Sequence, residues 1–128
     1  MGYTFDKTIE ATFDEAKERV VARLADAGFG VLTEIDVKAT MKKKLDEDLP
    51  PYTILGACHP PSAFRALSAE PHIGAMLPCN VIVRDVGEGS VQVSAVDPVA
   101  SMQAVDNAAL GEVAQEVQAA LRGVIDAL

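Results

Sequence analysis

The stretch NVIVRDVGEGSVQVSAV, residues 80–96, predicts a β-hairpin. In Asn80–Val86 and again in Ser90–Val96, apolar residues recur at every second position. This period is typical of strands that bury one face. Residues 87–89 read Gly-Glu-Gly and are predicted to form a three-residue turn, because glycine reaches the positive φ angles of tight hairpins. An antiparallel pair of strands is therefore expected in the sheet of this protein.

Three more strands are predicted on the N-terminal side of the hairpin. Alternation of side chains indicates strands at Tyr3–Ile9, at a segment carrying Phe29, Val31, Ile35 and Val37, and at Tyr52–Cys58. The strand at Tyr52–Cys58 carries apolar or small residues on both of its sides. It is therefore expected to lie in the interior of the sheet.

Helices are predicted between these strands and after the hairpin. Thr12 and Glu15 have the spacing of a capping box, which starts a helix that runs to about Ala27. Other helices are predicted at Val37–Leu45, at Pro61–Ala69 with Phe64 and Leu67 facing the core, and after Asp106, which is expected to cap the last one.

The order of these elements indicates the fold class. They run β-α-β-α-β-α-β-β-α, without a glycine motif for a phosphate or a dinucleotide. The sequence has no internal repeat, low-complexity segment or interior linker. We therefore expect a single α+β domain over residues 1–128, with an antiparallel-rich sheet packed by helices on one face.

Composition and charge exclude some classes of partner. The 128 residues are 49% hydrophobic, which is enough for one core, and the net charge is -8. A negative surface repels phosphate backbones and anionic lipids, so neither nucleic acid nor membrane is an expected partner. No apolar stretch approaches the roughly 18 residues of a spanning helix, and no signal segment opens the chain, so a cytoplasmic location is expected.

Two short strings contain both cysteines of the chain, next to prolines and at predicted element ends. The first runs from Gly56 to Pro61 and includes Cys58 and His59, and the second is Leu77-Pro78-Cys79-Asn80. Thiolate and imidazole suit zinc or copper(I), and a helix N-terminus favours a small anionic or polar ligand. Cys58, His59, Cys79 and Asn80 are therefore the candidate binding residues for a small ligand or a soft metal.

The residues leave three classes of function open. The first is a non-catalytic module that binds a small ligand or soft metal, and the second is a thiol enzyme or redox protein with Cys58 as nucleophile. The third is a structural protein in which the cysteines only pack, since free cysteine is often buried. The two thiols can share a site only if the strands that carry them are antiparallel.

The predicted last helix has a wide apolar stripe, which indicates a homodimer. Its apolar positions are numerous enough to serve both a core and a partner, and alanines extend the stripe at Ala108, Ala109, Ala114, Ala119 and Ala127. The residues themselves identify no cofactor.

The order of four strings resembles the domain of unknown function 302 family. They are the strand Tyr52–Cys58 with His59-Pro60, then Glu70–Gly74, then Leu77–Val83, then Asp97-Pro98. The resemblance covers essentially the whole chain. It implies a compact α+β domain with an antiparallel sheet, an architecture similar to the TATA-binding protein, and a homodimer. It implies no established activity.

Overall fold

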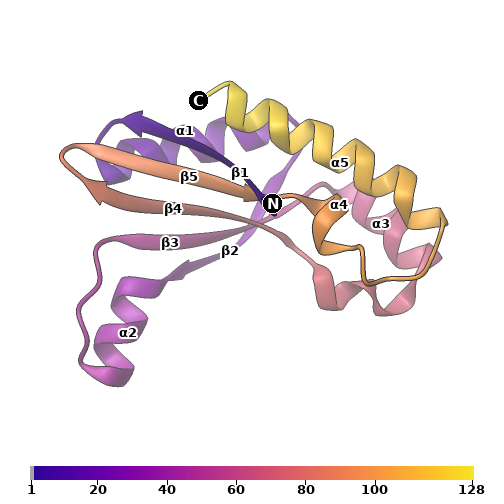
Figure 1. The fold of residues 1–128 in the computed structure, drawn as a ribbon, viewed down its shortest axis with the longest axis horizontal. Helices are drawn as coiled ribbons and strands as arrows, with labels where there is room; N and C mark the ends of the chain where they lie inside the picture. The colour runs from indigo at the N-terminus through magenta and orange to yellow at the C-terminus, as the bar shows by residue number, and fades with distance from the viewer. Residues whose placement is uncertain (1) are drawn as a thin grey trace.

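A five-stranded antiparallel sheet is the centre of the fold (Figure 1). The computed structural model describes residues 2–128. The strand order is β1-β5-β4-β3-β2, and every neighbouring pair is antiparallel. The α+β class and the antiparallel sheet predicted from the sequence are confirmed. The strands are β1 (Thr4–Glu10), β2 (Gly30–Asp36), β3 (Tyr52–Cys58), β4 (Cys79–Gly87) and β5 (Ser90–Val96).

The hairpin of β4 and β5 forms as predicted, but its turn is shorter. Gly87 pairs with Ser90, so only Glu88 and Gly89 lie between the strands. Their φ angles are 58° and 76°, the left-handed values that a two-residue hairpin turn requires at both positions. The expected three-residue turn was one residue too long, because a register shift after Asp85 brings Gly87 into the ladder.

Helices precede, connect and follow the strands. The Thr12 cap is confirmed: its hydroxyl oxygen accepts a hydrogen bond from the Glu15 amide at 3.2 Å, and the Glu15 carboxylate accepts one from the Thr12 amide at 3.2 Å. The helices are α1 (Phe13–Asp26), α2 (Val37–Leu45), α3 (Pro60–Ala69), the 3-10 helix η1 (Pro71–Met76), α4 (Pro98–Ser101) and α5 (Ala109–Asp126).

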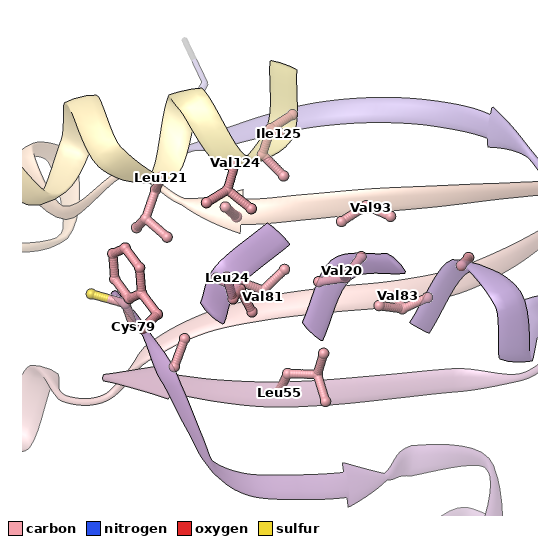
Figure 2. Close-up of a cluster of buried hydrophobic side chains, with 14 of the residues drawn as sticks. Val20, Leu24, Leu55, Cys79, Val81, Val83, Val93, Leu121, Val124 and Ile125 are labelled. Atoms are coloured by element: carbon pink, nitrogen blue, oxygen red, sulfur yellow. The ribbon is translucent and has the colours of Figure 1, made fainter. Parts of the chain in front are cut away.

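One face of the sheet is buried beneath α1 and α5. Alternate residues of the strands point to this face, and the apolar sides of the two helices pack on them. Figure 2 shows the helix residues Val20, Leu24, Leu121 and Val124 among the strand residues Leu55, Val81, Val83 and Val93. The remaining residues of the same strands, among them Ile54 and Ile82, lie on the opposite face.

Two details of the helices differ from the sequence-based expectations. Phe64 is 74% exposed and Leu67 is also exposed, whereas Ser62 and Ala66 are the buried residues of α3. The face of α3 that meets α5 is therefore made of small side chains, which helical periodicity of large residues does not reveal. Asp106 does not cap α5, because Asn107 supplies the oxygen that accepts from the Ala109 amide.

Helix α2 lies at the end of the β2–β3 pair, away from α1 and α5 (Figure 1). None of its residues is buried. Lys43 and Lys44 are exposed to solvent. Within residues 2–128, none of the helices combines the length and hydropathy needed to cross a membrane.

Truncation of Leu24 tests the packing of α1 on the sheet. Leu24 is 0% exposed, so Leu24→Ala should lower the free energy of unfolding by about 2–5 kcal/mol through lost burial and a residual cavity. Val21 lies on the outer side of the same helix, and Val21→Ala should change the free energy by about 0.5 kcal/mol or less. Urea denaturation measures both values. Equal losses in the two variants would contradict the assigned helix face.

Candidate functional site

The two cysteines lie at the same end of the sheet, because β3 and β4 are antiparallel. Ala57 at the end of β3 pairs with Cys79 at the start of β4, so Cys58 is one residue from the partner of Cys79. The sequence alone left open whether these two strands are antiparallel. They are, which is the arrangement that allows the two thiols to share a site. Both thiols contribute to the wall of one cavity.

This cavity has a volume of about 290 Å³ and lies where the sheet end meets α3, η1 and α5. It separates the main core from a smaller cluster built by α3, η1 and α5. Four residues of its wall carry polar atoms or thiols: Cys58, His59, Ser62 and Cys79. The others are Phe29, Leu32, Ala57, Ala63, Ala66, Leu67, Gly74, Leu77, Pro78, Met102, Val113, Ala114 and Val117.

Small side chains leave this volume open. Ala63 and Ala66 of α3, Gly74 of η1 and Ala114 of α5 all line the cavity. Leucine at such positions would fill the space with methyl groups, as in a normally packed core. The cavity therefore exists because these positions carry alanine and glycine.

His59 is fixed at the edge of the cavity by three contacts. Its Nδ1 atom lies 2.8 Å from the hydroxyl oxygen of Ser62, three residues later in the first turn of α3. Its ring lies 5.4 Å from the ring of Phe29, with a tilt of 55°. It also rests against Gly28, whose φ is 87° and where a Cβ would lie 3.2 Å from the ring. Nε2 of His59 has no hydrogen bond within residues 2–128.

The start of α3 offers few donors to an anion. Its first two residues, Pro60 and Pro61, have no backbone N–H. Within residues 2–128, no lysine or arginine lines the cavity. The expectation of a small anionic or polar ligand at this helix end is therefore not supported by the lining, which is mainly apolar.

Cys79 is the more deeply buried of the two thiols. Only 7% of its surface is exposed, and Figure 2 shows its sulfur on the side away from Val83 and Val93. Burial, with a smaller effect from nearby Cys58, raises the pKa of Cys79 to about 11. Cys79 is therefore a neutral thiol at neutral pH. Cys58 is partly exposed, and neither cysteine is in a disulfide.

Asn80 is separated from the other candidate residues. It follows Cys79 in β4, so its side chain lies on the opposite face of the sheet, and it is exposed. It does not line the cavity with Cys58, His59 and Cys79. Over residues 2–128, no three side chains of His, Cys, Asp or Glu are grouped as a metal site would require.

Sequence reasoning missed several residues of the cavity. Ser62 was not identified, although its position three residues after His59 is the spacing at which a helix cap meets the first turn. Phe29 was assigned only to a strand. The α5 residues Val113, Ala114 and Val117 were assigned to the apolar stripe of the last helix and not to the site, because only the fold brings α5 to this end of the sheet.

Comparisons with known proteins place the chain among relatives without a described activity. A family profile described as "Domain of unknown function DUF302" matches residues 5–128. A crystal structure described as an uncharacterized conserved protein DUF302 from Bacillus stearothermophilus superposes with a TM-score of 0.90 at 25% sequence identity. The match covers 98% of each chain. Among curated proteins, none matches.

The two thiols should differ in reactivity. The thiolate is the reactive form, and Cys79 is both buried and neutral at neutral pH. We therefore expect iodoacetamide to alkylate Cys58 at least about tenfold faster than Cys79 in the native protein. Peptide mass spectrometry over a time course measures both rates, and unfolded protein serves as the control in which both thiols react. Slow and equal labelling of the native protein would identify both as core thiols.

Proposed function

This chain belongs to the DUF302 family, and because the description of that family assigns no activity, we propose a function from the cavity. The chain is a non-catalytic module that binds a small, uncharged and mainly apolar ligand beside Cys58, His59 and Cys79. The observation that carries this proposal is an apolar cavity with one histidine nitrogen free of hydrogen bonds at its edge.

The size of the cavity supports a small ligand. Ligand pockets usually measure about 300–1,000 Å³, and an apolar cavity of about 150 Å³ can hold benzene. At about 290 Å³, this cavity suits a molecule of one or two rings or a short branched chain.

The chemistry of the wall supports an uncharged ligand. The lining has no cationic side chain to pair with an anion and no carboxylate to pair with a cation within residues 2–128. The polar groups that the wall could offer to such a ligand belong to Cys58, His59, Ser62 and Cys79. A soft metal is the less favoured occupant, because the described residues provide no cluster of three donor side chains.

The same geometry argues against catalysis by the thiols. Cys79 is held as a neutral thiol by burial. His59 uses Nδ1 for Ser62, and no hydrogen bond joins its ring to Cys58 within residues 2–128. Cys58 therefore lacks the adjacent base that activates a nucleophilic cysteine.

A dithiol redox protein is the second candidate. It is favoured by the antiparallel register, which brings Cys58 and Cys79 to one cavity wall. The two proposals differ in what Cys58 does. Cys58→Ser should retain ligand binding in a binding module, whereas a redox protein would lose its activity.

Binding of indole tests the first proposal. Indole is apolar and uncharged, and its N–H can donate to Nε2 of His59. We expect titration with indole to shift the amide NMR signals of Cys58, Ser62 and Val117, which line the cavity. Ala63→Phe should abolish these shifts because phenylalanine fills the space, whereas Ala69→Phe, at an exposed position of the same helix, should bind like the unmodified protein. Unchanged binding by Ala63→Phe, or no binding by either protein, would refute the proposal.

Replacement of His59 tests the polar contact separately. His59→Phe keeps a ring beside Phe29 but removes Nε2, so one hydrogen bond to indole is lost. We expect the Kd of indole to rise by about two- to tenfold, the usual worth of one hydrogen bond. Benzofuran has the shape of indole without the N–H, and its Kd should stay unchanged. Equal effects on both probes would show that His59 acts only by packing.

A further inference from the structure

The wall of the cavity continues into exposed apolar side chains. Leu32 of β2 and Leu67 of α3 both line the cavity, although 66% of Leu32 and 42% of Leu67 are exposed. Gly74, also exposed, lies beside Leu67, because a Cβ on this glycine would lie 3.9 Å from Cδ2 of the leucine. Phe29 and Val113 line the same cavity but are buried. Leu32 and Leu67 therefore mark where the cavity opens to solvent, and we call this pair the apolar rim.

A β-bulge in β2 accounts for the position of Leu32. Val31 pairs with Ala57, whereas Thr33 pairs with Gly56, the preceding residue of β3. Leu32 lies between these two pairs and has no partner on β3. The extra residue of a bulge leaves the regular alternation of its strand, and bulges often redirect a side chain in this way. The bulge thus lets a leucine of the edge strand line the cavity.

Gly56 allows the bulge to pack closely on the sheet. A Cβ at Gly56 would overlap the hydroxyl oxygen of Thr33 and would lie 2.7 Å from Cγ of Pro78. Both side chains therefore rest directly on the backbone of β3. Thr33 follows Leu32 in the bulge, and Pro78 is part of the cavity wall. Leu32 is thus presented to the opening from backbone that is packed on its neighbouring strand.

From these observations we propose that the ligand is an uncharged amphiphile, whose unbranched alkyl chain enters the cavity between Leu32 and Leu67 while its head group stays in water. This ligand class rests on the binding function proposed above. The buried part of the lining is mainly apolar and suits the chain. An alkyl chain that crosses the rim also removes the two exposed leucines from water, which is favourable in proportion to the apolar area covered.

The charges around the cavity favour an uncharged head group. Within residues 2–128, no side chain of lysine, arginine, aspartate or glutamate lines the cavity. Arg65 of α3 is already paired with Glu116 at 2.6 Å. The chain as a whole has a net charge of -8, which repels anions. A carboxylate head would therefore lack a partner at the opening.

A series of alkyl maltosides tests the ligand class. Octyl, decyl and dodecyl maltoside share one uncharged head and differ only in chain length. Below the concentrations at which they form micelles, each should shift the amide NMR signals of Ser62 and Val117, which line the cavity. The Kd should fall about fourfold per added methylene, the usual gain from burying one. Ala63→Phe should abolish all three interactions, and decanoate should bind at least about tenfold more weakly than decyl maltoside.

Truncation of Leu32 tests the rim. Leu32→Ala should raise the Kd of dodecyl maltoside about three- to tenfold, because the chain loses an apolar contact at the opening. The Kd of indole, which is small enough to lie inside the cavity, should stay unchanged. Leu45 is the matched control, because it is 65% exposed on α2 and does not line the cavity. Leu45→Ala should bind both probes like the unmodified protein.

The outcomes separate the ligand class from the binding function on which it rests. Binding of indole without binding of any maltoside would indicate an enclosed ligand, which overturns the amphiphile and leaves the binding function standing. Maltoside binding that survives Ala63→Phe, a Kd independent of chain length, or equal effects of Leu32→Ala on indole and dodecyl maltoside would also overturn it. Equal affinity for decanoate would refute the uncharged head. If neither indole nor a maltoside binds, both proposals fail.

Discussion

Burial of one sheet face under α1 and α5 is the constraint on which the rest of this structure depends. Each strand alternates its side chains between two faces, so once one face holds Val81, Val83 and Val93, the other face must take the intervening residues. The buried side of α5 is committed to this core. This core therefore leaves the end of the sheet and the opposite face outside it.

The end of the sheet shows how small residues create a site. The main core is packed by branched aliphatic side chains, but between it and the cluster around Ile73 the wall of the cavity includes four alanines and one glycine. His59 closes part of this wall, held by Ser62, Phe29 and Gly28. The cavity thus places a mainly apolar wall beside the imidazole of His59, and the proposed binding function rests on these two features.

The two cysteines have different surroundings although both line the same cavity. Cys79 belongs to a strand of the core, where low polarity disfavours its charged form. Cys58 ends β3 just before α3 and is partly exposed. This difference in burial explains why a shared position does not make the two thiols equivalent.

Much of the fold could be predicted from the sequence, because it is encoded locally. The Thr12 capping box, the strand at Tyr52–Cys58, the α2 helix and the glycines of the β4–β5 turn act over a few residues, and the structure contains all of them. For the candidate site the sequence indicated Cys58, His59, Cys79 and Asn80, of which the first three line the cavity, whereas it did not assign Ser62, Ala66 or Ala114 to the site. Only the tertiary structure decided which side of α3 is buried and that the lining of the site is mainly apolar. The physical reason is that a cavity is defined by side chains from distant segments, and their distances are set by the packing of α3 and α5 rather than by the pattern within either helix.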